Sequence, residues 1–176
     1  EPLAKMWNLS NDDSASLKEA CALSKTDLVS AIVREFPTLQ GVMGKHYALA
    51  GGKSRVIAEA IGEHYLPLAG KVPETLIGRA LSIIDKYDTL ACYFSLGLVP
   101  SEELSTSSDQ DPFGLRRTAQ GIVETIWLVQ RSLKLIDLFQ VFQRELQRQQ
   151  LTKAYKRIAK GAAPQPILAV EERAFQ

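Results

Sequence analysis

The sequence predicts an all-α fold, in which a bundle of amphipathic helices is followed by a C-terminal helical extension. Apolar residues recur at three- and four-residue spacing in several segments, and no segment alternates apolar and polar residues as a half-buried strand would. Prolines and glycines lie between these segments, where they end or begin helices. Hydrophobic residues make up 45% of the 176 residues, which is enough to bury a core in one domain.

The N-terminal half is predicted to hold three helices. The first spans residues 17–36, with Ser14 or Ser16 as its N-terminal cap and a proline at its end. A shorter helix over residues 39–49 ends at a pair of glycines. A third helix covers residues 54–66 and ends before a proline.

The C-terminal half is predicted to hold three longer helices. Pro73-Glu74 opens a helix that runs to about residue 98, since proline fits the first helical turn. The polar, serine-rich segment 99–110 is predicted to be a loop. Asp111-Pro112 opens the next helix, which runs to about residue 133, because aspartate can cap the unpaired N–H groups of a first turn. A last helix covers residues 135–160 and is strongly basic towards its end.

The composition excludes few classes of function. The 21 Lys and Arg residues nearly balance the 20 Asp and Glu residues, so the net charge neither favours nor excludes a nucleic-acid partner. Cys21 and Cys92 lie far apart in apolar segments, and we expect two buried thiols without a disulfide. No apolar run is long enough to cross a bilayer, and no signal peptide is visible. Because the chain begins Glu1-Pro2, we expect it to be an excised piece of a longer polypeptide.

Four motifs occur in a fixed order along the chain: SKTDLVSAIVREFPTLQGVMGKHYA, VIAEAIGEHYLP, LIGRALSIIDKYDTLACYF and DPFGLRRTAQGI. Together they resemble the β subunit of the bacterial two-subunit glycyl-tRNA synthetase, over about residues 17–126. The resemblance implies that residues 1–133 form the HD-like helical domain of that subunit, which is similar in fold to metal-dependent phosphohydrolases. Residues 134–176 would then be a basic helix and tail leading towards the next domain.

The resemblance also implies partners and cofactors. The family acts as glycine–tRNA ligase, an ATP-dependent aminoacyl-tRNA synthetase of the cytoplasm, and a separate α subunit carries the glycine site and uses ATP and Mg. The expected partners are therefore tRNA(Gly), that α subunit and other domains of the β subunit, with no membrane. The fragment itself is expected to hold no catalytic residue and no cofactor.

The residues that stand in place of the metal ligands of an HD phosphohydrolase predict a degenerate site without metal. Such an enzyme resembles a helical bundle holding metal with a His, an adjacent His-Asp pair and a later Asp, whereas this chain has Lys25 and Asp27 where the pair would be. His64 and Asp85 remain. Because a lysine ammonium repels a dication, we expect a Lys25–Asp85 ion pair instead of a metal, and a partly buried, hydrogen-bonded His64.

Three basic groups are candidates for RNA contact. The glycines and Met of EFPTLQGVMGKHYA favour a structural role through close helix packing, but Lys45 near the end of this stretch can reach a phosphate. Arg116 and Arg117 fall near a helix start, where the dipole disfavours cations, so either a carboxylate such as Asp111 or an RNA phosphate should compensate them. The last helix adds four cations that are either solvated or bound to RNA: Lys153, Lys156, Arg157 and Lys160.

Three functions follow from these observations. The first is a non-catalytic helical domain that helps to bind and position tRNA(Gly) for aminoacylation by the α subunit. The second is an HD-type metal-dependent phosphohydrolase, against which the missing ligands count. The third is a structural module that contacts neighbouring domains or the α subunit.

Overall fold

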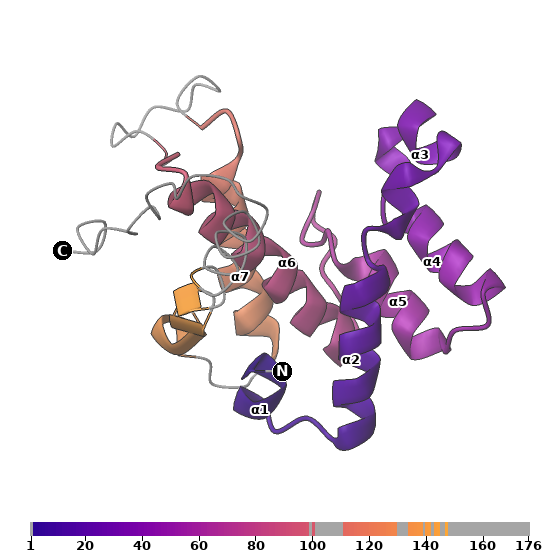
Figure 1. Cartoon of the computed structure of the whole chain (residues 1–176), viewed down its shortest axis with the longest axis horizontal. Coiled ribbons are helices and arrows are strands. Elements are labelled where there is room, and N and C mark those ends of the chain that lie inside the picture. Colours follow the sequence, from indigo (N-terminus) through magenta and orange to yellow (C-terminus); the bar gives the residue numbers. More distant parts are fainter. Residues whose placement is uncertain are drawn as a thin grey trace, which may run out of the picture.

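The computed structural model describes residues 2–98, 100, 111–129, 134–138, 140, 141, 143, 144 and 147. The named elements within them are all helices, and the single isolated bridge there joins Leu68 to Lys71, so the predicted all-α fold is confirmed. No helix in this part of the chain combines the length and apolar character required to cross a membrane. In chain order, the elements of Figure 1 are α1 Pro2–Met6, α2 Asn11–Leu23, η1 Thr26–Val29, α3 Ala31–Glu35, η2 Pro37–Leu39, α4 Val42–Ala50, α5 Arg55–Glu63, α6 Leu76–Ser95 and α7 Leu115–Val129.

The prediction of one helix over residues 17–36 is wrong, because α2, η1 and α3 occupy this segment. The helix also begins earlier than predicted. Ser10 Oγ accepts a hydrogen bond from the N–H of Asp13 at 3.0 Å, so Ser10 is the cap of α2 rather than Ser14 or Ser16.

Hydroxyl side chains end α2 and begin α3. Thr26 Oγ1 donates to the carbonyl of Leu23 at 2.7 Å, and Ser24 Oγ donates to a carbonyl one turn earlier. These bonds take up carbonyls that a longer helix would have paired with its own N–H groups. Ser30 then caps α3, since its Oγ accepts from the N–H of Val33 at 3.2 Å. As a result, α3 stands at the edge of the molecule (Figure 1).

Four large apolar side chains that the predicted helix would have buried are exposed instead. We call them the η1–α3 patch: Leu28 is 39% exposed, Val29 76%, Ile32 43% and Phe36 57%. Within α3, Val33 is the buried residue. Exposed apolar side chains that lie together mark surfaces that contact other molecules or domains.

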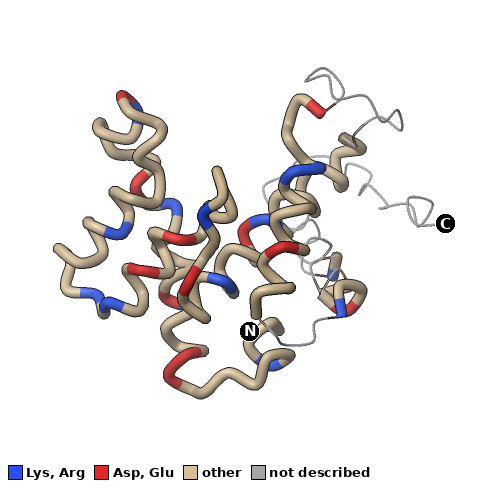
Figure 2. Tube along the Cα trace, turned by 180° about the vertical axis from the view of Figure 1, so that it is seen from behind, with Lys and Arg blue, Asp and Glu red and all other residues tan. Residues whose placement is uncertain are grey.

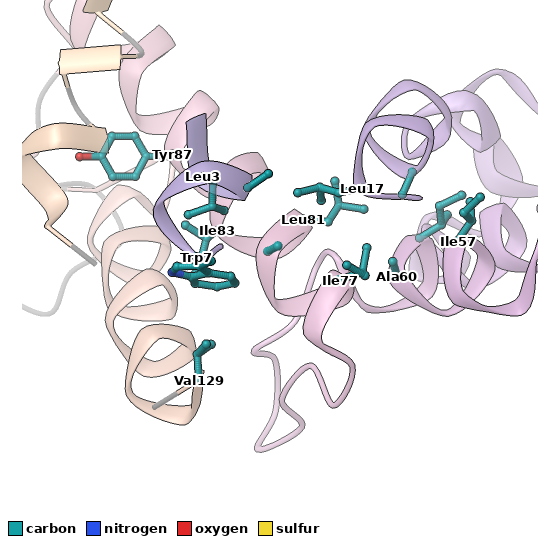
Figure 3. Packing of buried hydrophobic residues seen from close by; sticks show 14 of the residues in the cluster. Leu3, Trp7, Leu17, Ile57, Ala60, Ile77, Leu81, Ile83, Tyr87 and Val129 are labelled. Carbon is teal, nitrogen blue, oxygen red and sulfur yellow. The ribbon is translucent and has the colours of Figure 1, made fainter. Parts of the chain in front are cut away.

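The long helix α6 forms the centre of the core and packs against α1, α2, α5 and α7. Figure 3 shows two groups of buried side chains along it. Leu3 and Trp7 of the N-terminal segment lie with Ile83 and Val129, whereas Leu17 and Ile57 lie near the start of α6. The sequence did not predict α1, because five residues are too short to show a helical period.

The remaining predicted helices agree with the structure where it describes them. Residues 39–49, 54–66 and 74–98 correspond to α4, α5 and α6, each within a few residues. The predicted helix over residues 111–133 corresponds to α7, and residues 130–133 lie outside the described residues. The described residues between 135 and 147 are helical, whereas most of segments 99–110 and 148–160 is not described.

The predicted burial of the two cysteines is wrong. Cys21 and Cys92 are both exposed, and they do not form a disulfide. Each cysteine directly follows a buried alanine, Ala20 and Ala91, on its helix. One residue turns a helix by about 100°, and at these two positions this turn places the cysteine outside the buried side of its helix.

Candidate functional site

Two of the residues predicted to belong to a degenerate metal site, His64 and Asp85, lie around the ammonium of Lys25. Lys25 Nζ lies 2.8 Å from Asp85 Oδ1 and 3.0 Å from His64 Nε2, and it stands 4.0 Å from the centre of the Tyr65 ring. Lys25 follows α2, His64 follows α5 and Asp85 lies on α6, so the cluster joins three helices. The predicted Lys25–Asp85 ion pair is confirmed.

His64 is a neutral, hydrogen-bonded residue of the core. It is fully buried, and its Nδ1 lies 2.6 Å from the carbonyl of Ile61. A carbonyl only accepts and an ammonium only donates, so Nδ1 carries the proton and Nε2 accepts from Lys25. Burial lowers the pKa of His64, and the positive charge of Lys25 acts in the same direction. The predicted hydrogen bonding of His64 is confirmed, but the side chain is fully rather than partly buried.

Asp27 positions the start of α4. Its side chain is fully buried, and Oδ2 accepts from the N–H groups of Gly41 at 2.8 Å and Gly44 at 3.1 Å. Oδ1 is buried with no hydrogen-bond partner among the residues that the structure describes. The carboxylate therefore serves the free N–H groups and positive dipole end of a helix.

The glycines of EFPTLQGVMGKHYA have the structural role that the sequence favoured. Gly41 has a φ of +77°, a backbone angle that residues other than glycine rarely adopt. A Cβ on Gly44 would lie 2.8 Å from Ile61 Cγ2 and 3.2 Å from Asp27 Oδ2, so only glycine lets α4 approach α5 this closely.

This cluster does not fit a divalent cation. The Lys25 ammonium lies between the two nearest possible ligands, His64 and Asp85, and would repel a dication there. Asp27 already binds two backbone N–H groups. Within the described ranges, no group of three or more His, Cys, Asp or Glu residues is arranged to hold a metal ion.

The predicted RNA-binding residues fall into three situations. Lys45 is held by Glu59, whose Oε2 lies 2.6 Å from Nζ, and this hydrogen bond lowers the pKa of Glu59. Arg116 and Arg117 are exposed in the first turn of α7. The four remaining candidates lie outside the described residues: Lys153, Lys156, Arg157 and Lys160. Basic and acidic residues are interspersed along the described helices in Figure 2, so cations are not gathered on one helix there.

Asp111 supplies the carboxylate expected at the start of α7. Its Oδ1 accepts from the N–H of Leu115 at 2.7 Å, and its Oδ2 accepts from the N–H of Arg116 at 2.9 Å. The carboxylate therefore compensates the positive end of the helix dipole through the backbone. The guanidinium groups of Arg116 and Arg117 remain on the surface.

Sequence reasoning missed a buried lysine. Lys86 is 8% exposed, and its Nζ donates to the carbonyls of Leu66 and His64 and to Ser82 Oγ. Burial lowers its pKa to about 8, although the nearby Asp85 charge raises it. The burial of Lys86 could have been inferred from its position, because it directly precedes Tyr87 of the apolar stripe of α6.

Comparison with known proteins extends the similarity beyond the residues 17–126 predicted from the motifs. A family model described as glycyl-tRNA synthetase beta subunit matches residues 2–163. The glycine–tRNA ligase beta subunit of Halothermothrix orenii is 48% identical over 138 residues, which are 77% of this chain and 19% of the relative. The same subunit of Lacticaseibacillus casei is 45% identical over 126 residues, or 70% of this chain and 17% of the relative. That of Streptococcus pyogenes is 44% identical over 141 residues, or 77% and 20%.

These relatives match along most of this chain, yet the chain spans only about a fifth of their length. The match includes all four motifs, the Lys25 cluster and the start of α7. The chain therefore belongs to the glycyl-tRNA synthetase β subunit family.

Proposed function

We propose that this helical domain helps to bind and position tRNA(Gly) for aminoacylation by a separate α subunit. The observation that carries the proposal is the match to the glycyl-tRNA synthetase beta subunit along residues 2–163. In this proposal, the α subunit supplies the glycine site and uses ATP and Mg, and this domain holds no catalytic residue and no cofactor. The assembly works in the cytoplasm, together with the other domains of the β subunit.

The chemistry of the described surface supports a positioning role. Arg116 and Arg117 are consecutive exposed residues in the first turn of α7, and arginine forms bidentate hydrogen bonds with phosphate. Such contacts hold an RNA in one orientation and raise the effective concentration of its reactive end at a distant site. Lys45 contributes less, because Glu59 already neutralises its charge.

Photo-crosslinking in the complete α and β assembly tests this proposal. Benzoylphenylalanine placed at Arg116 in the full β subunit should crosslink to tRNA(Gly), whereas the same group at Lys18 on α2 serves as the control. We expect crosslinks from the α7 position that an excess of unlabelled tRNA(Gly) removes. If no exposed position of this domain crosslinks to tRNA in an active assembly, the proposal is wrong.

A contact with other domains or with the α subunit is the second candidate function, because large apolar side chains are exposed in two parts of the domain. The η1–α3 patch is one of them, and Trp127 of α7, which is 85% exposed, is the other. Surfaces of this kind are buried in assemblies. Faster hydrogen exchange of α3 in the free chain than in the whole β subunit would support this role.

The phosphohydrolase alternative has little support in the geometry, since Lys25 stands where a cation would have to bind. Metal analysis of the purified protein together with a nucleotide hydrolysis assay tests it directly. Stoichiometric divalent metal accompanied by turnover would restore this alternative.

A further inference from the structure

A groove of about 390 Å³ opens between the turn at residues 67–72 and one face of α7. The turn contributes Lys71, and α7 contributes Arg117, Gln120, Gly121 and Glu124. These four α7 residues are spaced three and four apart, so they share a single side of the helix. The groove thus has a basic residue on each of its two walls.

The wall that carries Lys71 is a tight, fully hydrogen-bonded turn. The N–H of Leu68 donates to the carbonyl of Lys71 at 3.0 Å, and the N–H of Lys71 donates back to Leu68 at 3.0 Å. Between them, Ala69 and Gly70 both have positive φ, which is the backbone of a two-residue hairpin turn. Ser82 Oγ and Lys86 Nζ both donate to the carbonyl of Leu66, which fastens the turn to α6. Lys71 therefore lies on a turn that is held in place by hydrogen bonds to α6.

The charges in the groove are not neutralised. Lys71 and Arg117 are both exposed, and neither forms an ion pair with any residue that the structure describes. Glu124 is the acidic residue of the lining, and its Oε1 accepts from Gln120 Nε2 at 2.7 Å. Two cations against one carboxylate leave a positive balance.

A third positive charge lies behind the groove. A Cβ on Gly121, which lines the groove, would lie 2.9 Å from Lys86 Cε and 3.4 Å from Pro67 Cδ. The Lys86 side chain therefore packs directly beneath this glycine. Its ammonium binds only neutral oxygens, so its charge adds to the field at the groove floor.

We propose that this groove holds a backbone phosphate of tRNA between Lys71 and Arg117, above the buried ammonium of Lys86. A phosphodiester is small enough for the groove, carries one negative charge and accepts hydrogen bonds from guanidinium, ammonium and amide donors. The inference rests on the proposed function and names the phosphate contact that the domain would use. It adds Lys71 to the candidates, which sequence reasoning did not single out.

The test measures the affinity of the complete α and β assembly for tRNA(Gly) between 50 and 200 mM KCl. Loss of one phosphate contact reduces the slope of log K against log salt by about 0.9, which corresponds to about eightfold weaker binding at 0.1 M salt. We expect this result for Lys71→Ala combined with Arg117→Ala. The matched control is Lys18→Ala combined with Arg34→Ala, which removes one exposed lysine and one exposed arginine on α2 and α3 and should change neither quantity.

The charge-preserving pair Lys71→Arg with Arg117→Lys should retain the wild-type slope. An alanine pair that binds tRNA like wild type overturns the inference, and so does a charge-preserving pair as weak as the alanine pair. Titration of inorganic phosphate into the same assembly identifies a site for free phosphate. Phosphate binding that the alanine pair abolishes while tRNA affinity stays unchanged also overturns the inference.

The outcome for the groove can be separated from the outcome for the proposed function. Crosslinks from Arg116 to tRNA with an unchanged salt slope in the alanine pair reject the groove alone. No crosslink from any exposed position of the domain rejects both.

Discussion

Replacing Lys86 with methionine tests whether a buried ammonium without a carboxylate partner weakens this fold. The described structure gives Lys86 three neutral acceptors, from Leu66, His64 and Ser82, and no ion pair. The nearest acidic group in the sequence, Asp85, pairs with Lys25. Methionine keeps much of the length and volume of the side chain and removes the charge.

The expected size and sign follow from the pKa of Lys86. A pKa of about 8 in place of 10.5 corresponds to about 3 kcal/mol that disfavours the charged form in the folded state. The unfolded state holds the proton up to pH 10.5, whereas the folded state releases it near pH 8. The unfolded state therefore binds more protons in this window, so the free energy of unfolding of the wild type rises with pH there.

The variant lacks this rise. At pH 7 we expect Lys86→Met to be more stable than wild type by about 2 kcal/mol, since about 1 kcal/mol is lost with the hydrogen bonds. Near pH 10.5 the wild-type amine is neutral and still hydrogen-bonded, so the variant should be less stable by about 1 kcal/mol. The difference between the two proteins therefore changes sign.

Urea unfolding followed by circular dichroism at several pH values between 7 and 10.5 measures this difference. Other groups titrate in the same range, including Tyr87, whose pKa is raised by burial, but they are common to both proteins and cancel. Lys18→Met, at an exposed lysine on α2, should change the unfolding free energy little at any pH. A difference between wild type and Lys86→Met that stays constant across the window would refute the reasoning.

Three further substitutions test the packing around the Lys25 cluster. Gly44→Ala should lower the free energy of unfolding, measured in urea, by about 1–3 kcal/mol, because the added Cβ would clash with Ile61. Helix propensity alone predicts that alanine raises the free energy of unfolding, so a more stable variant would contradict the packing argument. Asp27→Asn should cost about 1–2 kcal/mol at pH 7, since it removes the charge that binds two N–H groups of α4, and an unchanged melting temperature would show that the charge is dispensable. Lys25→Met should lower the free energy of unfolding by less than about 1 kcal/mol, because the ion pair is partly exposed. It should also raise the pKa of His64 in an NMR titration, because the Lys25 charge lowers that pKa in the wild type. A pKa of His64 that stays in place or falls argues against the observed contact.

The polar contacts between Lys25, His64 and Asp85 were predictable from the sequence for a specific reason. The resemblance to an HD-like fold places these residues on one site, and the charges of Lys25 and Asp85 then favour an ion pair. The role of Asp27 was not predictable in this way. Its partners are backbone N–H groups of Gly41 and Gly44. Every residue except proline has such a donor, so the residue types do not indicate the contact.

The limits of the periodicity argument show in the segment 17–36. Apolar spacing there fits one long helix, but the hydroxyls of Ser24 and Thr26 bind carbonyls of α2 and end it. Ser30 then restarts the helix in another direction. Local hydrogen bonds of a few serines and threonines thus outweighed a hydrophobic pattern. Beyond Val29, the side chain of Val33 is buried, whereas Ile32 and Phe36 stay exposed.

The groove could not be predicted from the sequence, because its two basic residues, Lys71 and Arg117, are 46 residues apart and neither wall is a motif. Lys71 lies in a turn that reads as a linker, and Arg117 is one of two arginines at a helix start. Their meeting depends on α7 packing along α6 and on the Leu66 carbonyl that anchors the turn. Both depend on tertiary contacts, which no local pattern encodes.

Lys25 and Lys86 have opposite consequences for function, and both follow from what surrounds the ammonium. Lys25 faces a carboxylate and an imidazole, so its charge is used within the fold and closes the cluster to cations. Lys86 donates to neutral oxygens and forms no ion pair with a described residue, so its charge contributes to the field in the groove beside Gly121. An anion in that groove would stabilise the charged form of Lys86 and so raise its pKa above about 8. Binding of tRNA and protonation of Lys86 should therefore favour each other, and tRNA affinity should fall as the pH rises above 8 in the wild type but not in Lys86→Met.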